Sequence, residues 1–535
     1  MRYPAWTGDD GPRRNARRLG ALREATAWPR AVGDALLGGQ PLSPIADVRR
    51  TSGLLLRFSF WGRLQGTSGC WKHYGSWGCE RWLRKSLLFG RDRVRARLSI
   101  PRLSKAKPFW SPKRGLVVGL ISVGVVLNYA DRQIIAVLKP MLQQDLGWTD
   151  TDYGQVTSAF QLASAFAFLG SGWLVDRIGW RRANPLAVGM WSLAAMSHAV
   201  ARTVGQFTLA RAALGATEAL GTPAWSKTIA ALFPNEFRAM AFAIFNASSN
   251  VGAVITPLVI PLVALKIGWA NAFVVTGGLG LLWVAAWTAL RPGLATATHG
   301  AAAPAPRASN TSLTEVLSNR RTWAVSGARV LSDNVWWLLL YWMPDLFHRV
   351  FHLGMAGFGV PLAVVYAVAA LGAVLAGLAS TALLGAGVSL NVTRKSLLLI
   401  AAVLVTPIWF AASVNNYWLA AAILGLALAA HQCFSVNVFA LATDVTPPER
   451  VATVVAIAAF CGNISGMVTL QVAGWVLDHG FGYAPLLAWA SISYLLGVGW
   501  VQLLLPVIKL TAPEPEATLV AKPGPHPRSA GHLRR

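Results

Sequence analysis

Charged residues are scarce in this sequence: Asp, Glu, Lys and Arg together make up 13% of its 535 residues. Soluble globular domains contain about 25% charged residues, whereas 54% of this chain is hydrophobic. The scarcity of charge excludes an ordinary soluble domain. The composition instead indicates an all-α protein that crosses a membrane many times.

Cysteine is also scarce, with four residues at Cys70, Cys79, Cys433 and Cys461. Their number and scatter exclude a disulfide framework and give no metal-ligand spacing. The sequence also lacks a phosphate-binding glycine loop, a paired metal-ligand motif and a nucleophile elbow. We therefore expect no metal, no cofactor and no enzymatic activity.

Residues 1–114 lack any apolar run long enough to span a membrane and do not begin like a secretory signal. They hold 24 Lys and Arg against 7 Asp and Glu, and so contribute +17 of the net charge of +26. The stretch RDRVRARLSIPRLSKAK would suit an arm that binds nucleic acid or acidic lipid. A disordered extension, translated from a start codon placed too far upstream, explains the composition better. We therefore expect no nucleic-acid partner.

Long apolar segments follow residue 114, and a transmembrane helix needs about 20 such residues. Twelve segments are long enough, at 115–138, 153–175, 183–201, 205–229, 238–264, 269–290, 322–346, 357–384, 395–413, 416–443, 451–476 and 482–506. This pattern predicts a membrane protein of twelve transmembrane helices, with lipid around it.

A linker at residues 291–321 divides the spans into an N-terminal half, 115–290, and a C-terminal half, 322–506, with a disordered tail at 507–535. The stretch NEFRAMAFAIFNASSNVG in the first half returns as PERVATVVAIAAFCGNISG in the second. Repeated halves place a substrate site at their interface, near the middle of the bilayer.

Positive charge marks the cytoplasmic side of short loops. If both termini are cytoplasmic, one side collects the loop DRIGWRR, Arg238, Arg307, Arg320, Arg321, Arg394, Lys395 and Arg450. Lys139, Arg202, Lys266 and Arg349 are the exceptions. We expect a multi-pass protein of the inner (plasma) membrane with both termini in the cytoplasm.

Two predicted spans of the N-terminal half contain acids together with arginines, and because ionisable residues are costly in hydrocarbon, these should face a partner or a cavity. Asp131 and Arg132 are adjacent in the first span, and Arg211 and Glu218 lie two helical turns apart in the fourth. An arginine fork can hold a carboxylate, and a buried acid can load and release a proton. These four residues therefore suit proton-linked movement of an anion, although a buried ion-pair network that only fixes helix packing remains the alternative.

Polar and aromatic residues elsewhere in the spans are further candidates for substrate contacts, because amides and rings can bind the hydroxyls and flat faces of a sugar acid. They are Tyr129, Gln161, Asn246, Asn250, Trp336, Trp337, Tyr341, His431, Gln432, Ser435 and Asn437. Trp336 and Trp337 would equally suit an interfacial aromatic belt, and Asn246 or Ser435 a bridge between helices. His431 could join a proton path or serve only as a hydrogen-bonding residue.

The loop GWLVDRIGWRR resembles the signature loop of the major facilitator superfamily, and it matches at Gly172, Asp176, Arg177, Gly179, Arg181 and Arg182. We expect Gly172 to permit close helix approach, and Asp176 to pair with an arginine or a helix N-terminus and hold one conformation. With twelve spans and a central linker, this resemblance implies the major facilitator fold.

The stretches NYADRQ and RAALGATEALGTP resemble the anion:cation symporter branch of that superfamily, and GWTDTDYGQVTSAFQ, DNVWWLLLYWMP and HQCFSVNVF are most similar to hexuronate transporters. The resemblance implies proton-coupled uptake of a sugar acid. It implies that Asp131 and Glu218 carry protons, and that Arg132 and Arg211 organise these acids and contact the substrate. Two departures affect the choice of substrate: Gly221 stands where Asn is common, and YAVAALG lacks an expected acid.

We therefore expect a transporter of a small organic anion such as galacturonate or glucuronate, with the proton as coupling ion and a single chain as the working unit. An aldonate, an aldarate or an aromatic acid is the alternative substrate. A sensor that keeps the fold without transport is a further alternative, but a sensor has no need of proton-carrying acids.

Overall fold

The computed structural model describes residues 112–233, 235–295, 313–447 and 449–509. Within these ranges the regular elements are helices, without β-strands. Most of the predicted N-terminal extension with Cys70 and Cys79, the middle of the linker with Arg307, and the tail from residue 510 lie outside the described residues.

The N-terminal half begins with two long helices and contains one interrupted span. Its helices are α4 (Pro112–Leu146), α5 (Asp150–Ile178), α6 (Trp180–Ser197), α7 (Val204–Glu218), α8 (Gly221–Leu232), α9 (Asn235–Ile267) and α10 (Trp269–Ala295), with the short 3-10 helix η3 (His198–Val200) after α6. The predicted fourth span is therefore two helices, α7 and α8, that meet directly after Glu218.

The C-terminal half is preceded by the six-residue helix α11 (Leu313–Ser318). Its spans are α12 (Arg320–Phe351), α13 (Gly359–Gly385), α14 (Leu390–Val405) continued by η4 (Thr406–Ala412), α15 (Tyr417–Val445), α16 (Val451–Asp478) and α17 (Ala484–Leu504). The repeated sequence stretches lie on α9 and α16, the fifth span of each half.

Nine helices of the described part are long and apolar enough to cross a membrane. The α6 helix, the α7–α8 pair and α12 complete the twelve predicted spans. The α12 helix falls outside the nine although it has 32 residues. From Arg329 to Arg349 it carries the buried acids Asp333 and Asp345, the half-buried Arg329 and the exposed Arg349, and this departure from an apolar composition marks it for function.

Side-chain caps set several helix starts. Thr149 and Asp152 form a reciprocal capping box at the start of α5, and Thr203 and Gln206 form another at the start of α7. Such caps bond backbone N–H groups that have no partner inside the helix. The helix ends that surround the site are therefore fixed by local sequence.

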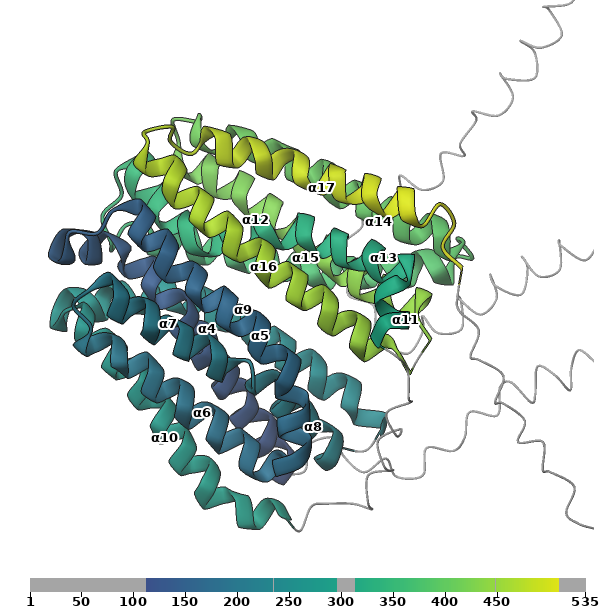
Figure 1. Cartoon of the computed structure of the whole chain (residues 1–535), viewed down its shortest axis with the longest axis horizontal. Coiled ribbons are helices and arrows are strands. Elements are labelled where there is room, and N and C mark those ends of the chain that lie inside the picture. The colour runs from purple at the N-terminus through teal and green to yellow at the C-terminus, as the bar shows by residue number, and fades with distance from the viewer. Residues whose placement is uncertain (1–111, 234, 296–312, 448, 510–535) are drawn as a thin grey trace, which may run out of the picture. The chain divides into compact units, whose positions relative to one another are not determined.

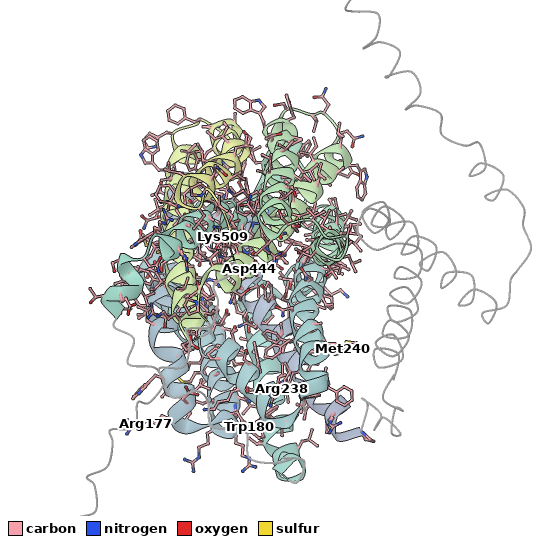
Figure 2. The ribbon with its side chains drawn as sticks, turned by 90° about the vertical axis from the view of Figure 1, so that its right-hand side faces the viewer. Arg177, Trp180, Arg238, Met240, Asp444 and Lys509 are labelled. Carbon is pink, nitrogen blue, oxygen red and sulfur yellow. The ribbon has the colours of Figure 1, made fainter. Side chains whose placement is uncertain are left out.

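The two halves form adjacent bundles, with α4–α10 in one and α12–α17 in the other (Figure 1). They meet where α4, α5 and α9 pack on α12, α16 and α13. Among the described residues, the loops predicted to share the cytoplasmic side lie at one end of the bundle, which we call the linker end; Figure 2 shows Arg177, Arg238, Asp444 and Lys509 there. The opposite end, where α4 ends and α5 begins, is called the Lys139 end.

Two glycines let α5 and α16 touch at the Lys139 end. A Cβ atom on Gly154 would lie 2.7 Å from the backbone oxygen of Leu470, and a Cβ on Gly474 would lie 2.5 Å from that of Asp150. Real Cβ atoms do not approach so closely, so a side chain at either position would force the helices apart. The halves are in backbone contact at this end.

Candidate functional site

Arg132 and Glu218 form an ion pair between α4 and α7. The Nη2 and Nε atoms of Arg132 lie 2.8 and 3.2 Å from Oε2 of Glu218. The guanidinium also lies 5.3 Å from the ring centroids of Tyr129 and Phe160, and 5.8 Å from that of Trp337 on α12. Arg132 therefore lies where both halves meet, as the sequence predicted for a substrate site.

Asp131 lies on a different side of α4. Successive residues of a helix point about 100° apart, so Asp131 does not pair with Arg132 but faces the neighbourhood of Thr276 on α10. Its side chain is fully buried, and neither carboxylate oxygen has a hydrogen-bond partner within the protein. Arg211, also fully buried, donates from Nη1 to the backbone oxygen of Asp131 at 3.2 Å and not to its carboxylate.

These four residues, Asp131, Arg132, Arg211 and Glu218, are called the central cluster. Several buried polar atoms in and beside it have no hydrogen-bond partner within the protein. They are both oxygens of Asp131, Oε1 of Glu218, Nε and Nη2 of Arg211, both amide atoms of Gln161, the hydroxyl of Tyr341 and Nε1 of Trp337. Buried polar atoms are nearly always paired in folded proteins, so such a concentration marks a place suited to a polar ligand.

The aromatic candidates on α12 divide between two environments. Trp337 and Tyr341 stack with ring centroids 6.3 Å apart and adjoin the central cluster. Trp336 instead stacks on His431 at 4.9 Å, and Nδ1 of His431 lies 2.7 Å from the hydroxyl of Tyr494. The interactions of His431 are thus made within the C-terminal half.

The remaining candidate residues have no direct contact with Arg132 or Glu218 among the described interactions. Ser435 accepts a hydrogen bond from Arg329, and Asn437 accepts one from Arg394 and donates to the backbone oxygen of Cys433. These contacts, too, lie inside the C-terminal half. On α9 the amide of Asn246 is exposed and donates to the backbone oxygen of Phe242, while Asn250 and, on α15, Gln432 are half-buried.

A second charged cluster, not predicted as a site, closes the Lys139 end. Lys139 on α4 is fully buried and donates to Asp150 of its own half and to Asp345 of the other, both at 2.7 Å. Arg349 forms a fork on Asp150 at 2.8 and 2.9 Å and reaches Asp345 at 3.3 Å, and the hydroxyl of Tyr483 donates to Asp345. These five residues form the Lys139 cluster.

Hydrogen bonds between side chains of one half and backbone atoms of the other also hold the two halves together at the Lys139 end. The carboxylate of Asp478, at the end of α16, accepts from the backbone N–H groups of Asp150 and Thr151 at 2.7 and 2.6 Å. An acid of one half thereby caps the first turn of a helix of the other half. Tyr153 also donates to the backbone oxygen of Tyr341 at 2.8 Å. The Lys139 end is tied across the two halves.

Two residues of the Lys139 cluster stand out in the sequence by their position. Lys139 and Arg349 were exceptions to the predicted sidedness of positive charge. Each has an acid within reach, Asp150 at 11 positions from Lys139 and Asp345 one helical turn from Arg349. When a Lys or Arg falls on the side of the membrane where positive charge is not expected, and an acid lies close to it in sequence, an ion pair is the better interpretation.

The signature loop makes different contacts from those expected. Asp176 pairs with Lys227 on α8 at 2.7 Å, and not with an arginine or a helix N-terminus. A Cβ atom on Gly172 would meet nothing within 4 Å, so this glycine does not mediate a close approach here. Gly179 separates α5 from α6 with a positive φ of 75°. Arg177 and Arg181 lie over the rings of Trp173 and Trp180, and Arg182 is exposed.

Gly221, the departure from the related pattern, has a steric reason. A Cβ atom at this position would lie 3.1 Å from the ring of Trp191 and 3.3 Å from that of Trp225. The two indoles therefore fill the space that a longer side chain would need. The position beside Glu218 is shaped by apolar rings, not by an amide.

Metal chemistry has no support in the described part of the chain, which contains no group of three or more His, Cys, Asp or Glu side chains that could hold an ion. A helical protein with two six-span halves and a buried cluster of ionisable residues at their contact is the architecture of a membrane transporter. Residues 121–470 match the family model of the Major Facilitator Superfamily, and the chain belongs to this family. It is a multi-pass membrane transporter and not an enzyme.

Relatives with assigned names narrow the class. The chain is 26% identical to the hexuronate transporter of Escherichia coli (strain K12) over 398 residues, which is 72% of this chain and 92% of the relative. It is 26% identical to the D-galactonate transporter of Escherichia coli O6:H1 over 433 residues, 76% of this chain and 99% of the relative. These similarities confirm the anion-transporter branch of the family.

Among solved structures, a bacterial homologue of the human lysosomal transporter Spinster, in an inward-facing and occupied conformation, superposes with a TM-score of 0.57. The match covers 74% of this chain and 96% of that one at 19% identity. Likeness at this level confirms the twelve-helix fold predicted from the sequence.

Proposed function

We propose that this chain is a secondary active transporter that takes up a sugar acid together with protons, by alternating access between its two halves. The observation that carries the proposal is the incomplete pairing of the central cluster. It contains two arginines and two acids, yet only Arg132 and Glu218 form an ion pair.

Charge balance gives this arrangement a reason to link an anion with a proton. With both acids ionised, the central cluster has two positive and two negative charges. One added carboxylate leaves an excess negative charge, which is costly in a buried site. One proton taken up by Asp131 or Glu218 restores neutrality, so anion and proton favour each other's binding.

The two acids would respond differently to a proton. Protonation of Asp131 breaks no hydrogen bond, because its carboxylate has no partner within the protein. Protonation of Glu218 weakens its bonds from Arg132 and makes that guanidinium available for another carboxylate. Proton binding at Glu218 and substrate binding at Arg132 are in this way two parts of one exchange of partners.

The surroundings of Arg132 suit a sugar acid. Trp337 and Tyr341 provide flat apolar faces, and the Gln161 amide faces the Tyr341 hydroxyl, with neither group closely hydrogen-bonded within the protein. A sugar acid has hydroxyls for the amide and the phenol, and C–H faces for the rings. The named relatives that carry hexuronates and D-galactonate support this class. We place the protein in the inner membrane, as a monomer with both termini in the cytoplasm.

The test uses the full chain in sealed vesicles, with labelled D-galacturonate, D-glucuronate and D-galactonate as probes. We expect accumulation of at least one probe that depends on an imposed proton gradient. Asp131→Asn and Glu218→Gln should insert normally and lose accumulation, with at least one variant keeping binding or exchange. Accumulation by both variants would remove the coupling role from these acids.

Other outcomes separate the alternatives. Gradient-dependent transport of an aldarate or an aromatic acid, with no transport of the three probes, would change the substrate and keep the mechanism. Binding without transport of any probe by the wild-type chain would favour a sensor.

A further inference from the structure

A row of six functional side chains follows α12 at intervals of four residues: Arg329, Asp333, Trp337, Tyr341, Asp345 and Arg349. Side chains four positions apart are neighbours on a helix. Both ends of the row close an ion pair within α12, Arg329 to Asp333 at 2.7 Å and Asp345 to Arg349 at 3.3 Å. The two aromatic residues next to Arg132 lie between these pairs.

The two end pairs have different neighbours. Asp345 and Arg349 belong to the Lys139 cluster and are bonded to the N-terminal half. Arg329 instead donates from Nη1 to Ser435 on α15 at 2.8 Å, and its guanidinium lies 4.8 Å from the ring centroid of Phe439. The pair nearer the linker end is therefore held by its own half.

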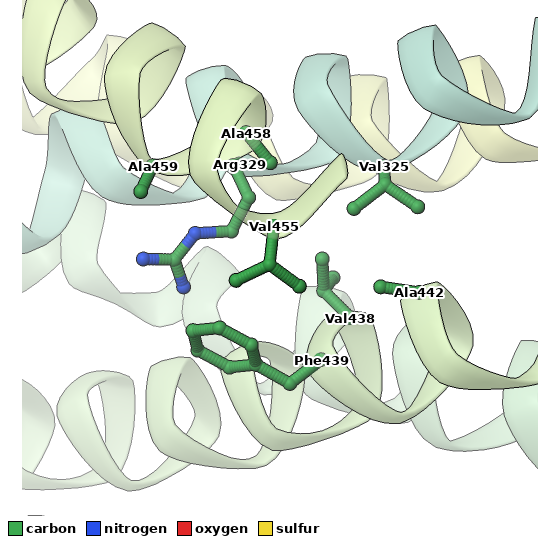
Figure 3. Close-up of a pocket in the computed structure, with 8 residues that line it drawn as sticks. All are labelled: Val325, Arg329, Val438, Phe439, Ala442, Val455, Ala458 and Ala459. Atoms are coloured by element: carbon green, nitrogen blue, oxygen red, sulfur yellow. The ribbon is translucent and has the colours of Figure 1, made fainter. Parts of the chain in front are cut away.

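Arg329 is the charged member of a pocket between α12, α15 and α16 (Figure 3). The other lining residues are apolar and mostly small: Val325, Val438, Phe439, Ala442, Val455, Ala458 and Ala459. The hollow has a volume of about 10 Å³, room for about one water molecule, so at most the charged end of an anion could approach the N–H fork of Arg329 through it.

The guanidinium of Arg329 has more N–H donors than its two side-chain partners use. Its five N–H groups serve one hydroxyl through Nη1 and one carboxylate through Nη2. The Arg329 side chain is 16% exposed, whereas that of Asp333 is 6% exposed. Arg329 is therefore the more accessible member of the pair.

Arg329 lies on the linker side of the central cluster along α12. Trp337, whose ring lies 5.8 Å from Arg132, is eight residues further along the helix. Eight residues correspond to about 12 Å along a helix axis, in the direction of the linker end. Arg329 therefore lies about 12 Å nearer the linker end than Trp337, on a neighbouring face of α12 that contacts α15.

We propose that Arg329 is a second carboxylate-binding residue, which receives the transported organic anion on the linker side of the central cluster by competing with Asp333 for the guanidinium. The inference rests on the proposed function. It adds a binding position in the C-terminal half, with Ser435 holding the fork in place and Asp333 releasing the anion.

A purely structural ion pair predicts a different outcome from a binding residue. If the pair only supports α12, removing either partner damages the protein in the same direction. If Asp333 competes with the substrate, its removal strengthens anion binding, while removal of Arg329 weakens it. The sign of the effect therefore separates the two roles.

The experiment measures KM from each side of the membrane, in vesicles of both orientations, with D-galacturonate, D-glucuronate and D-galactonate as probes. For Arg329→Gln we expect KM at the linker side to rise about tenfold or more, with a change below about threefold at the other side. Arg329→Lys should raise it several-fold, because an ammonium lacks the fork. Asp333→Asn should lower it about threefold or more.

The chain contains a matched control. Arg394 donates to Asp444 at 2.7 Å and to Ser380 at 2.8 Å, with its side chain 10% exposed, and so repeats the partners of Arg329 elsewhere in the same half. Arg394→Gln and Asp444→Asn should leave KM on both sides within about twofold of wild type, whatever their effect on abundance.

Each result decides between the roles. An unchanged linker-side KM in Arg329→Gln, or shifts of the same sign in Arg329→Gln and Asp333→Asn, would overturn the inference while the proposed function stands. If Arg329→Gln fails to insert, Arg329→Lys and Asp333→Asn decide by their opposite signs. A wild-type chain that transports none of the probes would remove both the inference and its basis.

Discussion

The Lys139 cluster and the central cluster contain the same kinds of groups, but their hydrogen bonding differs. In the Lys139 cluster each carboxylate has several donors, and Lys139 bonds two acids. In the central cluster the carboxylate of Asp131 and two nitrogens of Arg211 have no hydrogen-bond partner within the protein. Both clusters lie at the contact between the halves.

The two clusters differ in how completely their polar atoms are hydrogen-bonded, and this difference suggests different roles. A buried network that is fully paired adds rigidity, whereas a partly paired one is costly to fold. In the function proposed above, a ligand and a proton complete the central cluster and offset this cost. The Lys139 cluster has little left to bind and serves to hold the halves together.

The largest effect should come from breaking the paired cluster. Asp345 and Asp131 are 1% and 0% exposed, so Asp345→Asn and Asp131→Asn compare two equally buried acids. Asp345→Asn leaves Lys139 and Arg349 with one shared acid and should cost about 3–5 kcal/mol of stability. Asp131→Asn should change stability by less than about 1 kcal/mol, because no hydrogen bond is lost. Thermal unfolding of the purified variants measures both; equal losses would contradict the comparison.

The next effect concerns transport through the unpaired cluster. Arg132→Lys and Arg211→Lys keep the charge but lose the planar fork, so transport should fall about tenfold or more while stability changes little. Initial uptake rates per inserted molecule are the measurement. Arg202→Lys is the control, because Arg202 lies at the Lys139 end and donates to backbone oxygens of Ala199 and Ala201. Wild-type rates in both cluster variants would remove the arginines from the site.

A smaller effect should follow from separating the halves at their backbone contact. Gly474→Ala introduces a Cβ only 2.5 Å from the backbone oxygen of Asp150 and should cost about 1–3 kcal/mol. It should also raise the labelling of cysteines placed near the Lys139 cluster. Gly172→Ala has open space around it and should be neutral or stabilising by about 0.5–1 kcal/mol. A neutral Gly474→Ala would show that the contact is not tight.

The smallest effect should come from the exposed pair of the signature loop. Asp176 is 78% exposed and Lys227 33% exposed, and such pairs contribute about 0–1 kcal/mol. Lys227→Met should therefore leave the melting temperature almost unchanged, in contrast to Lys139→Met. A large loss from Lys227→Met would mean that the loop carries more of the stability than its exposure indicates.

The span count and the central residues were predictable because hydrocarbon imposes simple rules. Apolar length predicted twelve spans, and the cost of burying charge singled out Asp131, Arg132, Arg211 and Glu218. Pairing was not predictable, since neighbours in sequence diverge around a helix and the partner of Arg132 lies 86 residues away. Arg329 and Asp333, like Asp131, are ionisable residues within a predicted span. The cost of burying charge in hydrocarbon therefore singles them out as well.

The glycine contact between α5 and α16 also has a mechanical consequence. It lies close to one end of α16, so the rest of that helix, from Gly474 back to Val451, is a lever about 35 Å long. A rigid rotation of about 15° around this fulcrum displaces the far end by about 9 Å. The tight end of the transporter barely moves in such a stroke, while the opposite end opens by more than the width of a sugar ring.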